Sequence, residues 1–255
     1  MNTNGVRSIG TAALLTSACA LLFAACTSGP RLRHNHEFSL SPGQEHHAGL
    51  AKVLLLPLDS TNEKRVKGLD VANARIEALI VGHLESKGVT VERIDPRTFP
   101  GIREAARAHV LAERKSGDSG VVSTTFEFGD LVPEILAKLE KSPDLLIATD
   151  LVMRSAVYQG TRTIAWDGVR RRETVTDVHM TGSDLPAASV RAAVYSMDGT
   201  KVFAGFGGLE PVFRIDRANV KYVQRENLFE DERNLREGIC IAFYPYFGVE
   251  EFCSR

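Results

Sequence analysis

Just after residue 50 the chain reads Ala51-Lys52-Val53-Leu54-Leu55-Leu56-Pro57. A continuous apolar run of this kind, without polar alternation and bounded by turn residues, is typical of a strand that is covered on both faces. We therefore expect a central strand at residues 51–57, with packed layers on both sides of its sheet.

A helix and a second strand follow this run. Apolar residues between 69 and 87 recur at steps of three and four, which places one stripe on one side of a helix, and Gly88 supplies its end. Residues 89–94 are the next expected strand, closed by Asp95-Pro96. A strand, a helix and a strand within about 45 residues match the length of a crossover unit. The stripe consists of Leu69, Ala72, Ile76, Leu79, Ile80 and Leu84.

The alternation of helices and strands continues to residue 149. Residues 102–114 are rich in alanine and favour a helix, and residues 131–139 carry another helical stripe, with Pro133 tolerated in the first turn. The run Leu145-Leu146-Ile147-Ala148-Thr149 predicts a second buried strand.

Residues 153–215 have a different character, because strand-like stretches are separated by turn pairs. The clearest hairpin joins residues 189–195 to residues 201–205, and a last helix at 230–243 is stopped by Tyr244-Pro245. The turn pairs are Asp167-Gly168, Gly182-Ser183 and Asp198-Gly199.

These elements predict one α+β domain at residues 50–255, with a central mixed sheet, flanking helices, hairpins in the second half and a closing C-terminal helix. The composition agrees, since 44% of the 255 residues are hydrophobic and 25% are charged, as in folded globular proteins. With 31 Lys+Arg against 32 Asp+Glu, no basic surplus marks the chain for nucleic acid.

The amino-terminal residues carry an apolar run, Ile9 to Ala25, that contains no charged residue. It ends in Phe23-Ala24-Ala25-Cys26, which is followed by Thr27-Ser28-Gly29-Pro30. This pattern resembles the bacterial lipobox, although Phe23 stands where Leu is usual. The resemblance implies that residues 1–25 are a lipoprotein signal peptide and that Cys26 carries lipid, palmitate included.

Two alternatives stay open at this end of the chain. Cys19 is a rival lipidation site, and the apolar run could remain as an uncleaved anchor helix. In lipobox families Asp after the lipidated Cys tends to retain the protein at the inner membrane. Thr27 stands there, so the resemblance implies the periplasmic face of the outer membrane.

Residues 26–49 predict a flexible tether, because they are rich in Ser, Pro, Gly and Arg and have no sustained apolar period. The histidines of this segment could bind a transition metal, but their spacing is loose and carboxylates are few. We therefore predict no metal site and no cofactor. The metal candidates are His34, His36, His46 and His47.

Removal of Cys19 and lipidation of Cys26 would leave Cys240 and Cys253 as the remaining cysteines. An even pair in an exported, oxidising compartment predicts a disulfide, and two separate buried thiols are the alternative. A disulfide would hold the apolar segment 244–252, which we expect to present an exposed patch for a partner.

The order of elements resembles a group of bacterial envelope proteins that includes the TolB amino-terminal domain, the curli secretion lipoprotein and the lipoprotein activator of penicillin-binding proteins. The resemblance covers residues 51–243, but Leu58 stands where the group often has Phe, and residues 162–182 have no counterpart. It implies a periplasmic protein-binding module without chemistry. The matching residues are Leu55-Leu56-Pro57-Leu58, Glu92-Arg93, Pro143-Asp144-Leu145-Leu146-Ile147 and Asp198-Gly199-Thr200-Lys201.

We therefore expect an outer-membrane lipoprotein that binds another envelope protein and is not an enzyme; the sequence leaves its oligomeric state open. Such a module predicts no cleft lined by titratable groups. The candidate partner-binding residues are Arg170, Arg171, Arg172, Tyr244, Tyr246 and Phe247, and the three arginines could equally form a solvated strand edge.

Two alternatives to a binding module remain. One is an envelope hydrolase with a pocket around Asp150, His179 and Asp184; the other is a metal-binding lipoprotein that uses the histidine tether. The sequence Gly117-Asp118-Ser119-Gly120 resembles the nucleophile segment of chymotrypsin-like proteases. We interpret Ser119 as a loop residue, because a base at the distance that this family requires is missing and the elements are not all-β.

Overall fold

The computed structural model describes residues 36–42, 51–60, 69–116, 127–159, 163–172, 184–216, 221–247 and Cys253. Its centre is an eight-stranded mixed sheet, in which six strands follow the order β1-β8-β7-β4-β2-β3 and β5 and β6 extend the sheet from β4. This confirms the predicted α+β class with a mixed sheet and a closing helix. The strands of this sheet are β1 (Phe38–Leu40), β2 (Lys52–Leu55), β3 (Thr90–Arg93), β4 (Leu145–Tyr158), β5 (Thr163–Trp166), β6 (Val169–Arg172), β7 (Asp184–Tyr195) and β8 (Lys201–Pro211).

The parallel part of the sheet is built around β2, which pairs with β3 on one side and with β4 on the other. Val53 and Leu55 of β2 pack in one core with five residues of α1 (Leu69–Ser86), which are Ala72, Ile76, Leu79, Ile80 and Leu84. Leu54 and Leu56 pack in a second core with α2 (Phe99–Ser116), the 3-10 turn η2 (Phe128–Leu131) and α3 (Val132–Leu139). The predicted central strand, covered on both faces, is therefore confirmed.

The antiparallel part consists of β4, β7, β8 and β1. β4 has 14 residues and continues well beyond the predicted strand at 145–149. The prediction of a tether up to residue 49 was too long, because Phe38–Leu40 pair with β8 as an edge strand.

Helix α4 (Glu232–Phe243) lies directly on β8, as the prediction of a closing helix required. The contact is close because glycines face each other. A Cβ at Gly207 would overlap the carbonyl oxygen of Gly238, and a Cβ at Gly238 would overlap that of Gly208. Cys240 of α4 bonds to Cys253, with Cα atoms 5.2 Å apart, so the predicted disulfide is confirmed.

The hairpin β5–β6 turns at Asp167-Gly168, where both residues have positive φ, as the predicted turn pair requires. The carbonyl oxygen of Asp167 accepts a hydrogen bond from the backbone N–H of Gly208, so the hairpin curls from β4 across to β8. The second confirmed turn, Asp198-Gly199, joins β7 to β8; Gly182-Ser183 lies outside the described residues.

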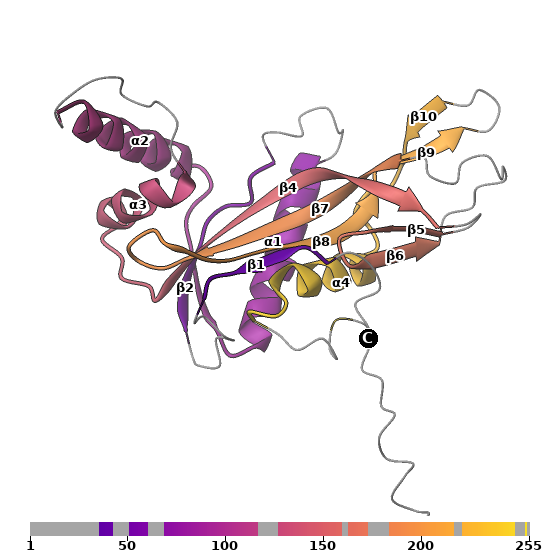
Figure 1. Cartoon of the computed structure of the whole chain (residues 1–255), viewed down its shortest axis with the longest axis horizontal. Coiled ribbons are helices and arrows are strands. Elements are labelled where there is room, and N and C mark those ends of the chain that lie inside the picture. The colour runs from indigo at the N-terminus through magenta and orange to yellow at the C-terminus, as the bar shows by residue number, and fades with distance from the viewer. Residues whose placement is uncertain are drawn as a thin grey trace, which may run out of the picture.

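Figure 1 shows that α2 and α3 cover one end of the long sheet, whereas the two-stranded ribbon of β9 (Phe213–Asp216) and β10 (Lys221–Gln224) lies at the opposite end. In this view α1 and α4 lie between these ends, with α1 running across the direction of the long strands. Within the described part of the chain, no helix combines the length and the hydropathy needed to span a bilayer.

Candidate functional site

The carboxyl end of β2 lies beside the first residues of β4, because Val53, Leu54 and Leu55 pair in parallel with Leu145, Leu146 and Ile147. The connection from β2 to β3 runs through α1 on one face, and the connection from β3 to β4 runs through α2 and α3 on the other. Ligands of α/β sheets bind preferentially outside the carboxyl ends of parallel strands. The side chains beyond the carboxyl end of β2 are therefore candidates for a binding site.

A small cleft of about 90 Å³ opens at this place. Its floor is formed by Ala148 of β4 and Ala193 of β7, which are direct cross-strand partners, and their short side chains leave room above the sheet. Phe99 of α2 and Phe128 of η2 line it from the helical side. The cleft is thus an apolar hollow between the sheet and the helical end of the molecule.

Two ion pairs lie at the polar side of this hollow. The segment after β2 bridges to β4 at Asp59 and Asp150, which brings the two carboxylates to neighbouring positions. Nη1 of Arg103 lies 3.2 Å from Oδ2 of Asp59, and Nε of Arg191 donates to Oδ2 of Asp150 at 2.7 Å. Two carboxylates and two guanidinium groups therefore line one cleft without a net charge.

The surroundings shift the pKa values of two groups in the cleft. Burial raises the pKa of Asp150, and the nearby Asp59 raises it further, while Arg191 lowers it. Burial also raises the pKa of Tyr195, which lines the cleft beside Phe128. Arg191 is the group that most opposes this rise in the pKa of Asp150.

A cleft with these groups contradicts the expectation that the domain lacks one. Asp59, Arg103, Arg191 and Tyr195 were not among the predicted site residues. The sequence contained one indication that the two carboxylates lie close together. Asp59 and Asp150 each follow a buried apolar run, and polar residues that follow parallel strands gather at one edge of the sheet.

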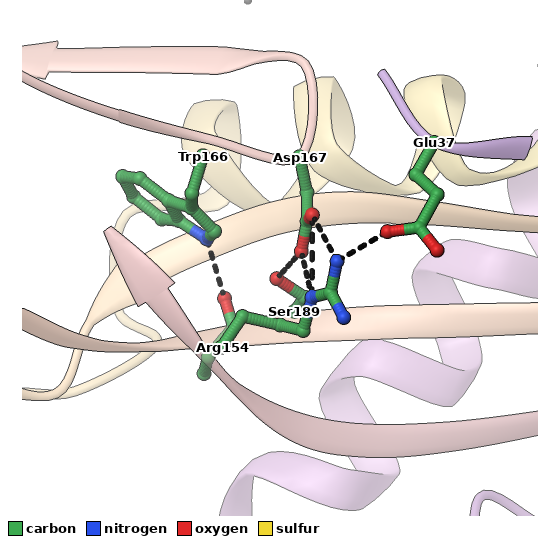
Figure 2. A network of polar contacts seen from close by, with 6 residues as sticks. Glu37, Arg154, Trp166, Asp167 and Ser189 are labelled. Carbon is green, nitrogen blue, oxygen red and sulfur yellow. Dashed lines mark hydrogen bonds and ion pairs between the residues drawn. The ribbon is translucent and has the colours of Figure 1, made fainter. Parts of the chain in front are cut away.

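A second polar group lies further along β4. Figure 2 shows Arg154 between Asp167 at the tip of the β5–β6 hairpin and Glu37 just before β1. Nε of Arg154 lies 3.2 Å from Oδ2 of Asp167, and Ser189 donates to the same oxygen at 2.6 Å. Because Asp167 is only 5% exposed and meets a cation and a hydroxyl, this network holds the hairpin to the sheet.

A larger polar cavity of about 400 Å³ lies between β6 and the segment that precedes α4. Arg172 and Arg225 line it together with Glu210, which is 9% exposed. The Glu210 carboxylate accepts a hydrogen bond from the backbone N–H of Phe229 at 2.7 Å, and burial raises its pKa. Phe229 has a φ of 63°, so this contact holds a strained turn in place.

The prediction of an exposed patch at residues 244–252 was wrong for Tyr246 and Phe247. They are each only 3% exposed, because the chain after α4 turns back over the sheet and stacks Tyr246 on Phe203. These two residues belong to the core and not to a docking surface. Tyr244 is half-buried and its ring lies near that of His36.

The three arginines of β6, predicted either to bind a partner or to form a solvated strand edge, differ in their exposure. Arg171 is not available to a partner protein, since it pairs with Glu237 of α4 at 2.6 Å and its side chain is 11% exposed. Arg170 and Arg172 are exposed on an outer strand of the sheet.

Of the four histidines of the predicted tether, the structure describes His36. Nε2 of His36 lies 3.0 Å from the carbonyl oxygen of Ile241, so His36 is part of the folded domain; His34, His46 and His47 lie outside the described residues. Among the residues that are described, ligand atoms converge instead at His109, Glu113 and Glu134 on α2 and α3.

The residues proposed for a hydrolase do not converge where the structure describes them. Asp150 pairs with Arg191 near the middle of β7, whereas Asp184 begins β7 and pairs with Val157 near the far end of β4. His179 and Ser119 lie outside the described residues.

No protein-family model and no curated protein matches the chain. Among solved structures, it is similar to a PelC dodecamer from Paraburkholderia phytofirmans, with 11% identity over 69% of this chain and 80% of that one and a TM-score of 0.32. It is also similar to a protein described as a neuraminyllactose-binding hemagglutinin homolog from Helicobacter pylori, with 7% identity over 80% and 86% of the chains and a TM-score of 0.30. With scores this low, the two likenesses bear on neither the ligand nor the partner of this chain.

Proposed function

We propose that the protein is an outer-membrane lipoprotein, anchored through Cys26, whose periplasmic domain binds another envelope protein without catalysis. The sequence Phe23-Ala24-Ala25-Cys26 supports the anchor through its resemblance to the lipobox. The domain would then face the periplasm, where a partner protein is within reach.

The disulfide between Cys240 and Cys253 is the observation that carries this proposal. Both cysteines are 6% exposed, so the bond belongs to the folded core and not to a reactive surface. Disulfides persist in exported compartments and are rare in the cytosol. An exported domain agrees with the signal and anchor inferred from the first 26 residues.

The proposed partner surface lies at the end of the sheet opposite the cleft. Val157 is 41% exposed and Tyr222 51%. They are neighbours, because Tyr222 donates to the carbonyl oxygen of Asp184, which is the cross-strand partner of Val157. Arg170 joins them through its hydrogen bond to Gln159. We call Val157, Arg170 and Tyr222 the distal patch; it suits a partner with apolar and acidic side chains.

Fractionation of cells that express Cys26→Ser tests the anchor. The variant should leave the membrane fraction and lose the mass of the lipid, whereas the matched control Cys19→Ser should remain lipidated and membrane-bound. An unprocessed amino terminus in the wild-type protein, measured by intact mass, would refute the anchor.

Crosslinking in intact cells followed by mass spectrometry tests the partner surface. Replacing Tyr222 by Ser and Arg170 by Glu should remove one envelope protein from the crosslinked set, because the first change deletes apolar contact and the second reverses a charge. The control is Met197→Ser, an exposed apolar residue at the β7–β8 turn near α3. Equal recovery of partners from both variants would contradict the proposed surface.

A further inference from the structure

We propose that the cleft beyond the carboxyl end of β2 binds a free α-amino acid with a short apolar side chain. The proposal is independent of the distal patch, which lies at the other end of the sheet. It rests on the volume of the hollow, on the carboxylates and guanidinium groups at its polar side, and on its position beyond the carboxyl end of β2.

The hollow has the size of a small side chain. A volume of about 90 Å³ holds several water molecules, or an aliphatic group of about four carbons. Its floor and walls are apolar, with Ala148 and Ala193 below and Phe99 and Phe128 beside them. An aliphatic group that enters this space leaves water and gains packing contacts.

The charges at the polar side complement both ends of a zwitterion. Both contacts of Arg191 with Asp150 use Oδ2, so Oδ1 of Asp150 is able to accept from an ammonium group. Each guanidinium has five N–H donors, and the side chains of Arg103 and Arg191 are 45% and 47% exposed, so donors remain for a carboxylate. A zwitterion leaves the cleft neutral, whereas an amine or a carboxylate alone adds one unbalanced charge.

The contribution of the Asp150–Arg191 ion pair to folding stability does not by itself explain why these charges lie beside the hollow. The side chain of Asp150 is 19% exposed, and ion pairs with arginines as exposed as Arg191 contribute little to folding. A bound ammonium group would give this partly buried carboxylate a second cationic partner besides Arg191.

Calorimetry on the full-length protein in detergent, with L-alanine, L-valine and L-leucine as probes, tests the proposal. At least one of the three should bind with a Kd below about 10 mM. Isobutylamine and isobutyrate each lack one of the charges and should bind at least about tenfold more weakly than L-valine.

Two variants locate the binding in the cleft. Ala193→Leu fills the hollow and should abolish binding, and a thermal unfolding midpoint close to that of the wild type would show that the variant is folded. Arg103→Gln changes an exposed side chain of α2 and should weaken binding by about tenfold. Arg170→Gln, in the distal patch, is the matched control and should leave the affinity unchanged.

Three results would overturn the proposal. They are the absence of binding for all three amino acids at about 10 mM, binding of isobutylamine or isobutyrate as tight as that of L-valine, and an unchanged affinity in both Ala193→Leu and Arg103→Gln. None of these results affects the anchor or the distal patch, which are measured by fractionation and crosslinking.

Discussion

At the residue scale, several charged side chains of the sheet have partners that are distant in sequence. Asp150 and Arg191 are direct cross-strand neighbours, and Asp167 reaches Arg154 and Ser189 from the tip of a hairpin. Charged residues inside strands would weaken a sheet if they were left alone. Here each charge meets an opposite charge or a hydroxyl, so the strands continue through them.

His83 is a residue whose polar ring is placed against the core. Its ring lies 5.8 Å from that of Phe243, and its Nε2 is buried without a hydrogen-bond partner among the described residues. Burial, and to a smaller degree the charge of Lys87, lowers the pKa of His83 from 6.5 to about 4. The folded protein therefore keeps this imidazole neutral where an unfolded chain would protonate it.

This shift predicts a pH dependence of stability. Above pH 6.5 His83 is neutral in both the folded and the unfolded state, so it does not change the free energy of unfolding. As the pH falls from 6.5 to about 4, only the unfolded state gains the proton. The free energy of unfolding should fall by about 3 kcal/mol over this interval and change no further below it through this group. Denaturant unfolding of the wild type and His83→Phe at several pH values measures the difference.

The control for this prediction is His109→Phe, because the side chain of His109 is 49% exposed on α2. His109→Phe should keep the wild-type loss of stability between pH 6.5 and 4, whereas His83→Phe should reduce it. If the two variants lose stability with pH to the same extent, the assignment to His83 fails.

At the scale of elements, the glycines of β8 and α4 decide how closely helix and strand approach. Gly207 and Gly208 lie on β8, and Gly238 lies in the middle of α4. A Cβ at Gly207 or Gly238 would overlap the backbone of the other element, and a Cβ at Gly208 would overlap the side chains of Val169 and Trp166. The helix therefore lies on the strand itself and not on a layer of side chains.

We expect Gly207→Ala to reduce the free energy of unfolding by about 2 kcal/mol or more, because the methyl group forces α4 away from β8. The matched control is Gly82→Ala in α1, where a Cβ meets nothing within 4 Å. That change should raise stability by about 0.5–1 kcal/mol through helix propensity. Denaturant unfolding of both variants gives the comparison, and equal effects would show that the close approach is unimportant.

The length of β4 shows where local pattern stops being informative. The apolar run ends at Thr149, but the strand continues to Tyr158 because β7 pairs with it along this length. Asp150 and Arg154 interrupt the apolar pattern that sequence reasoning depends on. Their partners, Arg191 and Asp167, belong to other elements and cannot be identified from residues nearby.

At the scale of the whole molecule, the disulfide ties the end of the chain to the core. Cys253 is bonded to Cys240 at a sequence separation of 13, and Cys240 packs with Ile241 and Trp166 in one core cluster. The bond therefore restricts the unfolded chain and fixes residue 253 beside the β5–β6 hairpin.

Reduction of this bond should lower the free energy of unfolding by about 3 kcal/mol, as expected for a loop of this length. Unfolding in denaturant with and without a thiol reductant measures the loss. The double variant Cys240→Ala, Cys253→Ala should be less stable than the oxidised protein and insensitive to the reductant. A reductant effect of equal size in the double variant would assign the loss to something other than this bond.

The candidate site could be predicted only in part. Asp150 was named among the possible functional residues, but Asp59, Arg103 and Arg191 were not. Asp59 lies 44 residues from Arg103, and Asp150 lies 41 from Arg191, and no periodicity connects positions that far apart. The error at Tyr246 and Phe247 has the same cause, since their exposure depends on how the chain turns after α4.

By itself, the sequence determined the elements and the covalent link: a central strand at 51–57, the stripe of α1, the two Asp-Gly turns and the Cys240–Cys253 pair. Each depends on residue types within a few positions or, for the cysteines, on which thiols remain. Tertiary structure alone decided that Asp59 beyond β2 and Asp150 within β4 meet in a charged cleft and that Tyr246 and Phe247 after α4 are buried. Those features arise when strand register and helix packing bring remote side chains together, and neither is encoded in a short stretch of chain.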